Sequence, residues 1–326
     1  MRMTSIVLAC CAGLIALALS SETSAQGGAY PVKPVRLIVP YAPGGGTDIV
    51  ARAFAPKLSE MWNQQVVVDN RGGGSTIIGT ELAAKAPADG YTLLMGTTTL
   101  AINSSLRRKL PYDTLKDLEP VTQTASQAYI LAVHPSVPAR DVKGFIALAK
   151  AKPGTLNYGS PGTGSGSHLA GELFAMLSGV RLIHIPYKGS GPALTDLLGG
   201  QIQLIFGTIL STFPHVKSGK LRALGVSSPK RVAVLPDIPS IREGGVAAYG
   251  ATSWNGVLTP AGVPTPLLAR LNADIVKALQ SPEVRARLAG DGGEVVGNSA
   301  QEFRAHIQNE IVQWAKVVKA AGLKAQ

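Results

Sequence analysis

Two glycine-rich turns constrain this chain more than any other feature, because each stands between an apolar strand-like run and an amphipathic helix-like run. The first turn is PYAPGGGTD at residues 40–48, and the second is YGSPGTGSGSH at residues 158–168. Such a turn directs the first N–H groups of the following helix toward the strand ends, where the helix dipole adds partial positive charge. This position suits a carboxylate or a phosphate. Two such turns, far apart in sequence, predict a two-lobed cleft that holds an anionic ligand at both ends.

The first 25 residues predict an export signal. A short start with Arg2 is followed by an apolar run at 6–19 and by small residues at 23–25. The run is shorter than the roughly 18 to 20 apolar residues that a membrane span requires. We therefore expect cleavage near Ala25 and a soluble mature protein in the periplasm. The alternative is a lipoprotein attached through Cys10, since VLAC at 7–10 resembles a lipobox.

Composition excludes several classes of function. Both cysteines, Cys10 and Cys11, lie in the leader, so the mature chain has no thiol for catalysis, redox chemistry or metal binding. The net charge of +11 is spread without a basic run, and aromatic residues are only 5%, which argues against a nucleic-acid partner. A diffuse positive field suits the collection of small anions. The spacing of the histidines does not suggest a metal site, and we expect no cofactor.

Strand-like and helix-like runs alternate along nearly the whole chain, which is typical of an α/β fold with helices on both faces of a mostly parallel sheet. Pro56 is expected to kink the first helix, and Asp141 and Ser299 to cap two later ones. The expected strands are 35–39, 66–69, 92–95, 130–133, 157–159, 183–186, 202–206 and 223–226. The expected helices are 47–62, 76–85, 142–152, 168–177, 191–198, 266–279 and 300–320.

Two stretches, 121–127 and 249–255, separate complete sets of alternating units and are interpreted as crossings between lobes. The expected organisation is a signal peptide at 1–25, lobe I at 26–124 and 252–326, and lobe II at 125–251. Two lobes joined by two crossings form a hinged cleft. About 300 mature residues are enough to bury a core in each lobe.

Eight segments, in order along the chain, resemble the Bug family, the periplasmic solute receptors of tripartite tricarboxylate transporters. The resemblance implies a two-lobed α/β receptor with the Venus flytrap architecture of periplasmic binding proteins. Such a receptor binds a small carboxylate between its lobes, largely through main-chain groups and water. It also implies permease subunits as membrane partners, and we expect a monomer. The segments are VPYAPGGGTDIVAR at 39–52, DNRGGG at 69–74, ADGYTLL at 88–94, LPYD at 110–113, LNYGS at 156–160, SHL at 167–169, PYKG at 186–189 and PAGVP at 260–264.

The candidate ligand-binding residues come from the turns. Glycines would let the backbone approach a ligand, hydroxyl groups would supply neutral donors, and Thr47 or Asp48 would cap the first helix. Tyr187 is expected as a wall of the pocket. Whether Lys188, Arg71 or His168 touches the ligand is left open, with a structural role favoured for Arg71 and His168. The candidates are Tyr41, Pro43, Gly44, Gly45, Thr47, Asp48, Ser160, Thr163, Gly164, Ser167, Tyr187, Gly207 and Thr208.

One departure from the Bug pattern concerns Gly207. The family commonly has an Asp-Asn pair after this strand, where the present chain reads FGTIL at 206–210. The loss of a carboxylate facing the cleft favours a simple carboxylic acid over an amino acid as ligand, and predicts that Gly207→Asp weakens the binding of an acid.

The sequence therefore predicts a binding protein that catalyses no reaction. Two alternatives stay open: a sensory carboxylate receptor that signals to a membrane kinase, and a hydrolase that uses a Ser or His in the same turns. The motifs G-x-S-x-G, G-x-x-x-x-G-K-[ST] and G-x-G-x-x-G do not occur. The S-x-x-K match at 227–230 stands without the other elements of that catalytic set.

Overall fold

The computed structural model describes residues 30–320. The chain divides into two compact units, Met1–Val32 and Lys33–Gln326, and every element below belongs to the second. The expected signal peptide lies outside the described residues. No helix within 30–320 has the length and apolar character needed to cross a membrane.

Helices and strands alternate as the sequence predicts, and every expected segment overlaps an observed element. The strands are β1 (Val35–Val39), β2 (Val66–Asn70), β3 (Thr92–Thr97), β4 (Leu118–Val133), β5 (Asn157–Ser160), β6 (Ile183–Pro186), β7 (Leu204–Thr208), β8 (Arg222–Val226), β9 (Thr252–Pro260) and β10 (Glu294–Val295). The helices are α2 (Gly46–Trp62), α3 (Ile77–Ala84), α4 (Thr98–Leu106), α5 (Val142–Ala151), α6 (Gly166–Ser178), α7 (Ser190–Leu198), α8 (Ile209–Lys217), α9 (Thr265–Leu279), α10 (Pro282–Gly290) and α11 (Ala300–Ala320).

The sheet is mixed rather than mostly parallel. Among the strands within residues 30–320, parallel pairing is confined to β2-β1-β3 and to β6-β5-β7. The strands β4 and β9 pair with each other and with their other neighbours in antiparallel fashion. Since β4 and β9 are where the sequence predicts crossings between lobes, the antiparallel pairs come from the connecting strands.

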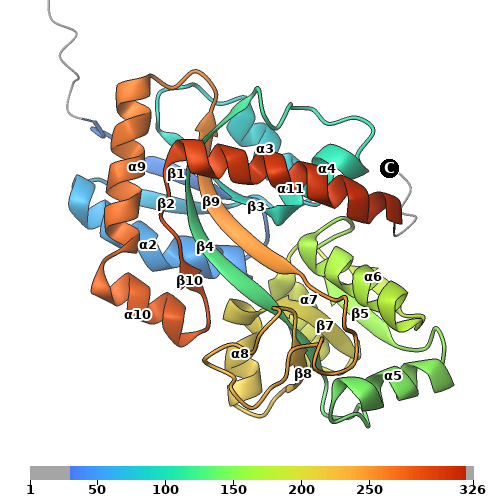
Figure 1. Ribbon diagram of the computed structural model, residues 1–326. Helices are drawn as coiled ribbons and strands as arrows, with labels where there is room; N and C mark the ends of the chain where they lie inside the picture. The colour runs from blue at the N-terminus through green and yellow to red at the C-terminus, as the bar shows by residue number, and fades with distance from the viewer. Residues whose placement is uncertain (1–29, 321–326) are drawn as a thin grey trace, which may run out of the picture. The chain divides into compact units, whose positions relative to one another are not determined.

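The long strand β4 belongs to two sheets. Residues 118–128 pair with β9, and residues 129–133 pair with β7 and β8 (Figure 1). We call the A half the sheet β2-β1-β3-β9-β4-β10 with α2, α3, α4, α9, α10 and α11. The B half is the sheet β4-β7-β5-β6 and β8 with α5, α6, α7 and α8. The lobe boundaries at 124/125 and 251/252 stay a prediction.

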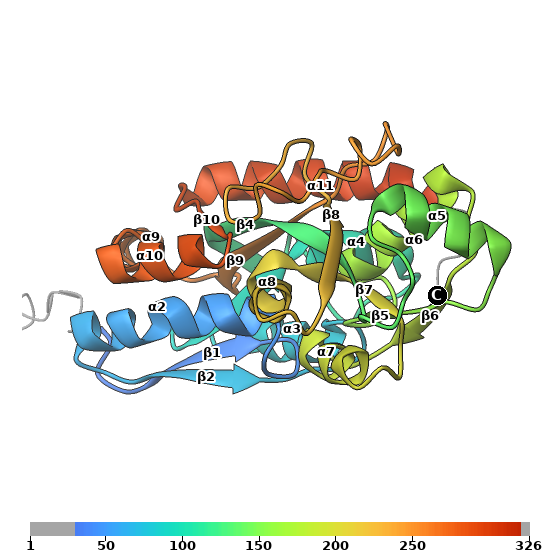
Figure 2. The ribbon, with the colours of Figure 1, turned by 90° about the horizontal axis from the view of Figure 1, so that it is seen from below.

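Each half is covered on both faces. In the A half, α11 runs across β4 and β9 beside α4, whereas α2 lies against β1 and β2 on the opposite face (Figures 1 and 2). In the B half, one buried cluster joins α5 and α6 to the sheet, and a second cluster joins α7 and α8 to its other face. This arrangement leaves the carboxyl ends of the parallel strands, rather than their faces, for a ligand.

Local signals explain several element boundaries. Asp141 caps α5, with its carboxylate accepting from the Gly144 N–H at 2.7 Å, as expected. Ser299 and Glu302 form a reciprocal capping box at the start of α11. Pro56 lies on an exposed position of α2, and the helix continues through it to Trp62.

Candidate functional site

A cavity lies where the carboxyl ends of β1, β3, β5 and β7 meet between the halves. Its volume is about 420 Å³, including space open to solvent. Residues from the A half, the B half and the connecting strands contribute to its wall, so the cavity depends on the two halves being together. Its lining consists of Tyr41, Gly45, Gly46, Thr47, Thr97, Thr98, Thr99, Tyr129, Pro161, Ser165, Gly166, Ser167, Ser190, Thr208 and Ser253.

Five helices begin at this cavity: α2 and α4 from the A half, and α6, α7 and α8 from the B half. The first N–H groups of a helix have no intrahelical partner and carry partial positive charge. The N-cap residues of α2, α7 and α8 are Gly45, Gly189 and Thr208, and none of the three makes a side-chain capping hydrogen bond within the described structure. The cavity is therefore surrounded by backbone donors that suit an anion.

The side chains of the lining add neutral donors. Eleven of the fifteen lining residues carry a hydroxyl group, three are glycine and one is proline. The part of the wall formed by the described residues thus has neither a basic nor an acidic side chain. A ligand carboxylate would meet hydroxyl and N–H donors here, whereas a ligand ammonium group would meet no carboxylate to offset the cost of its desolvation.

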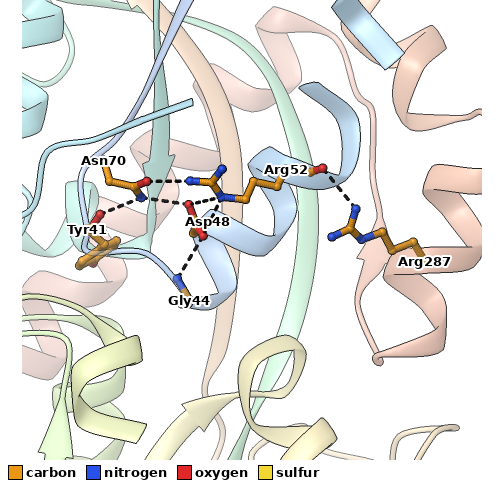
Figure 3. Close-up of polar contacts among 6 residues, drawn as sticks. All are labelled: Tyr41, Gly44, Asp48, Arg52, Asn70 and Arg287. Atoms are coloured by element: carbon orange, nitrogen blue, oxygen red, sulfur yellow. Dashed lines mark hydrogen bonds and ion pairs between the residues drawn. The ribbon is translucent and has the colours of Figure 1, made fainter. Parts of the chain in front are cut away.

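The first glycine-rich turn is held by the carboxylate of Asp48. This carboxylate accepts hydrogen bonds from the Gly44 N–H at 3.0 Å, from Arg52 Nε at 3.0 Å and from Asn70 Nδ2 at 2.9 Å (Figure 3). Asn70 also donates to the Tyr41 carbonyl at 3.1 Å and accepts from Arg52 Nη2 at 3.0 Å. The expectation that Thr47 or Asp48 caps α2 is wrong, because the N-cap is Gly45; Asp48 instead reaches back from the first helical turn.

The Asp48 carboxyl stays ionised in this arrangement. Burial alone would raise its pKa, but the hydrogen bonds from Arg52, the Gly44 N–H and Asn70 outweigh burial and lower the pKa below its usual range. Asp48 as a whole residue is 4% exposed, and it does not line the cavity. The negative charge of Asp48 therefore stabilises the turn and does not face the space that a ligand would occupy.

Two hydroxyl groups of the A half are oriented by neighbours. The Tyr41 and Thr99 hydroxyls share a hydrogen bond of 2.7 Å. Asn255 Nδ2 donates to Thr47 Oγ1 at 3.1 Å, and the Asn255 amide is itself fixed by Gln127 at 3.0 Å. Because Thr47 Oγ1 accepts from Asn255, its own proton is left for donation. Burial raises the pKa of the Tyr41 hydroxyl, which keeps that group protonated and able to donate.

The second glycine-rich turn uses its hydroxyls for internal bonds. Ser160 Oγ is 2.6 Å from His184 Nε2 and donates to the Gly162 carbonyl at 3.0 Å, and the Ser160 side chain lies outside the cavity. Ser167 Oγ donates to the Phe206 carbonyl at 2.5 Å while lining the cavity. His168 Nδ1 accepts from the Gly164 N–H at 3.1 Å. His168 is buried and does not line the cavity, which supports the structural role predicted from the sequence.

The predicted residues thus fall into three groups. Tyr41, Gly45, Thr47, Ser167 and Thr208 line the cavity. Pro43, Gly44 and Tyr187 line an open groove of about 1,090 Å³ between the first turn and α7, where the Tyr187 hydroxyl donates to Asp196 at 2.6 Å. Asp48, Ser160, Thr163, Gly164 and Gly207 line neither space.

The position of Gly207 changes the interpretation of its departure from the Bug pattern. Gly207 is in β7, paired with Ile130, and a Cβ atom added to it would collide with Thr212 Oγ1. A side chain at this position would therefore point into the interface between β7 and α8 rather than into the cavity. The neighbouring Thr208 is the residue of this strand that lines the cavity.

The two basic residues left open by the sequence are also placed. Arg71 Nε donates to the Asp69 carboxylate at 2.9 Å, a pairing within the A half rather than with an acid of the other half. Lys188 is exposed, and its carbonyl accepts from the Ala42 N–H at 3.0 Å. Neither residue is part of the cavity lining.

Sequence reasoning missed ten of the lining residues. Thr97, Thr98 and Thr99 form the start of α4, a helix rich in β-branched residues that was not expected. A run of three threonines directly after a buried strand was the available signal, because it places hydroxyls at a strand end. Tyr129 and Ser253 come from the connecting strands, which carry no local motif. The remaining five are Gly46, Pro161, Ser165, Gly166 and Ser190.

Comparison with known proteins finds relatives that match nearly the whole chain. BugT of Bordetella pertussis is 38% identical over 312 residues, which cover 95% of this chain and 94% of that protein. The solved structure of Rpa4515 of R. palustris with adipate is 38% identical, covers 90% of this chain and 98% of that one, and gives a TM-score of 0.87. The structure of MatC from Rhodopseudomonas palustris with bound malate is 31% identical. The match covers 89% of this chain and 100% of that one, and gives a TM-score of 0.85.

The fold and its structural relatives define an α/β solute-binding protein of the periplasmic type. Residues 50–323 match the model of the tripartite tricarboxylate transporter family receptor, TctC. The chain belongs to this family, and its similarity to BugT confirms the resemblance to the Bug receptors.

Proposed function

We propose that the protein captures a small mono- or dicarboxylate in the periplasm and presents it to the permease subunits of a tripartite tricarboxylate transporter. One observation carries the proposal: five helix N-termini and eleven hydroxyl-bearing residues surround a cavity whose described wall has no charged side chain. Backbone N–H groups and hydroxyls donate to carboxylate oxygens without a permanent counter-charge. The relatives with bound adipate and malate support a carboxylate as ligand.

The same wall favours a simple acid over an amino acid. Binding of an ammonium group in a partly desolvated site needs an acceptor of negative charge. Asp48, the acidic residue nearest in sequence to the lining, is engaged by Arg52, Asn70 and the Gly44 N–H. Position 207 does not bear on this preference, because Gly207 faces Thr212 rather than the cavity.

A hydrolase that uses Ser and His is less well supported. Ser160 and His184 are within hydrogen-bond distance, but Ser160 is fully buried and lies outside the cavity. Ser167 lines the cavity and donates its proton to the Phe206 carbonyl, not to a histidine. A nucleophile needs both an adjacent base and access to the substrate, and neither serine combines the two.

A thermal-shift screen followed by calorimetry tests the proposal. The panel contains acetate, lactate, succinate, malate and adipate, with aspartate, glutamate and glucose as controls. A ligand present at 100 times its Kd stabilises the folded protein by about 2.7 kcal/mol, which gives a visible rise in Tm. We expect a carboxylate to bind in the presence of EDTA and to be recovered unchanged. Preferential binding of glucose, or turnover of the bound acid, would refute the proposal.

A further inference from the structure

The tip of the second glycine-rich turn, in the B half, is bound by two side chains of the A half. Ser75 Oγ donates to the Thr163 carbonyl at 2.6 Å, and Arg107 Nη2 donates to the same oxygen at 3.1 Å. Ser75 precedes α3, and Arg107 directly follows α4. A carbonyl that receives two donors, one of them charged, is a strong point of attachment between the halves.

The Ser75 segment is held in a conformation that L-amino acids rarely adopt. Ser75 has φ of +50° and Thr76 has φ of +76°. The fully buried Asn103 fixes both residues, since its Nδ2 donates to the Ser75 carbonyl at 2.8 Å and to Thr76 Oγ1 at 3.3 Å. Strained backbone persists only where its surroundings impose it, and it is often associated with a functional contact. Here the contact that results is the hydrogen bond from Ser75 to Thr163.

The fit at the tip leaves no room for side chains on either side of Thr163. A Cβ atom on Gly162 would collide with Ser75 Oγ, which is within 2.5 Å of it, and one on Gly164 would collide with Leu106 Cδ2. Both glycines also have positive φ, +145° and +85°. The tip therefore enters a close-fitting recess formed by the A half.

The same turn forms a wall of the cavity with residues on either side of the tip. Pro161, Ser165 and Ser167 line the cavity, whereas Thr163, Ser75 and Arg107 do not. The contact at the tip thus holds the wall in place without touching the space that a ligand occupies. The residues that fix the turn are therefore different from those that line the ligand cavity.

We propose that Ser75 and Arg107 are positioning residues that latch the second turn over the cavity and slow the release of the bound solute. The identity of the solute, a small carboxylate, rests on the proposed function. Closure of the two halves brings the turn against Ser75 and Arg107. The hydrogen bonds from these two side chains stabilise the closed state whether or not a ligand is bound. The chain then holds a closed population in the absence of ligand.

Dissociation rates of the tightest-binding acid of the panel test the latch. We expect Ser75→Ala to accelerate dissociation about fivefold, the change that the loss of one hydrogen bond typically causes. The control is Ser178→Ala, which removes a Ser Oγ hydrogen bond of the same 2.6 Å length to the Phe174 carbonyl within α6. The control should leave the dissociation rate unchanged. An unchanged rate in Ser75→Ala would overturn the latch.

Ser75→Gly separates the latch from a merely structural role. Glycine tolerates positive φ, so this variant relieves the strain and should unfold no more easily than Ser75→Ala. It still lacks the hydroxyl and should release the ligand as fast as Ser75→Ala. A dissociation rate that follows stability, with Ser75→Gly close to wild type, would contradict the positioning role.

Small-angle X-ray scattering keeps the latch testable if the proposed function fails. If no acid of the panel binds the wild-type protein, the proposed function is refuted. The radius of gyration of the ligand-free protein then decides the latch on its own, with Ser75→Ala combined with Arg107→Met as the variant. We expect the variant to be larger than wild type, and equal radii would overturn the latch.

Discussion

The two glycine-rich turns line the same cavity, yet different contacts hold them. The first turn is fixed by Asp48, Arg52 and Asn70, all from the A half to which the turn belongs. The second turn is fixed by Ser160 and His184 from the B half at its base, and by Ser75 of the A half at its tip. The side chains that fix the first turn therefore belong to its own half, and one main-chain hydrogen bond, from the Ala42 N–H to the Lys188 carbonyl at 3.0 Å, joins it to the other. The tip of the second turn is fixed by a side chain of the other half.

This difference gives the two walls of the cavity different roles in binding. A wall that is organised in advance lowers the ordering cost of association, because its donors already point into the site. A wall completed by closure links ligand capture to a movement of the two halves. The ionised side chains that fix the first turn lie outside the cavity, so the described lining of the cavity is uncharged.

The largest expected effect concerns the strand next to the second turn. Gly207→Asp places a carboxylate against Thr212, between β7 and α8, where the nearest side chains, those of Thr212 and Ile205, are uncharged. An uncompensated buried charge should lower the free energy of unfolding by about 3–5 kcal/mol, as urea denaturation would show. The control is Gly290→Asp, since Gly290 has open space around it. Unchanged stability with altered ligand preference would place position 207 in the cavity after all.

The next effect tests whether the first turn is held from within. Asp48→Ala removes the acceptor of three hydrogen bonds and should cost about 2 kcal/mol of unfolding free energy. Asp69→Ala serves as the control, because Asp69 pairs with Arg36 and Arg71 outside the turn. If Asp48→Ala keeps wild-type stability but loses ligand affinity, Asp48 contacts the ligand and the comparison of the turns fails.

The parallel strands were predictable because short buried runs bounded by glycine-rich turns leave a strong signal. The strand β9 was missed since it is buried on both faces and shows no alternation, and Gly256 within it packs against the ring of Phe303. The helix α4 was missed because its β-branched start has low helix propensity. Tertiary packing forms both elements, and α4 brings three threonines to the cavity.

The cavity lining was predictable in part for the same reason. Glycine-rich turns indicated where Gly45, Thr47 and Ser167 would lie, because helix starts and strand ends meet there. The direction of each side chain was not in the sequence. Ser160 and Ser167 are both serines of one turn, and only the packing of His184 and Phe206 decides which of them faces the cavity.

The second turn should be more sensitive to acid than the first. Burial, together with the neighbouring His168, lowers the pKa of His184 to about 3. The unfolded chain then binds a proton below about pH 6.5 that the folded chain does not, so stability falls as the pH drops from 6.5 toward 3. After allowance for partial exposure of the ring, we expect a loss of about 1 kcal/mol at pH 5. The Asp48 carboxyl, with its lowered pKa, stays ionised in that range.

Melting curves of wild type and His184→Gln between pH 7 and pH 4.5 measure this difference. The fall in Tm should be shallower in His184→Gln, because the variant lacks the titrating ring. His168 also has a pKa lowered by burial, and Glu172 beside it opposes that shift, so some acid sensitivity remains in the variant. Parallel curves for the two proteins would show that His184 does not carry the effect.

The smallest effect concerns the side chain of Lys188. Its carbonyl, not its ammonium group, joins the halves by accepting from the Ala42 N–H. Lys188→Ala keeps that carbonyl and should change the Kd of the bound acid less than twofold at physiological salt, where an exposed charge is screened. Calorimetry that finds a tenfold loss would assign Lys188 a direct ion pair with the ligand.

The central claim is that helix N-termini and hydroxyl groups, without a charged side chain or a metal, recognise a carboxylate. The most direct measurement is a pair of calorimetric titrations in EDTA, with the tightest-binding dicarboxylate of the panel and with its diamide, which has nearly the same shape but no charge. We predict that the dicarboxylate binds and that the diamide binds at least about 100-fold more weakly, the loss of roughly 2.7 kcal/mol. Equal affinity for the two compounds would contradict the claim.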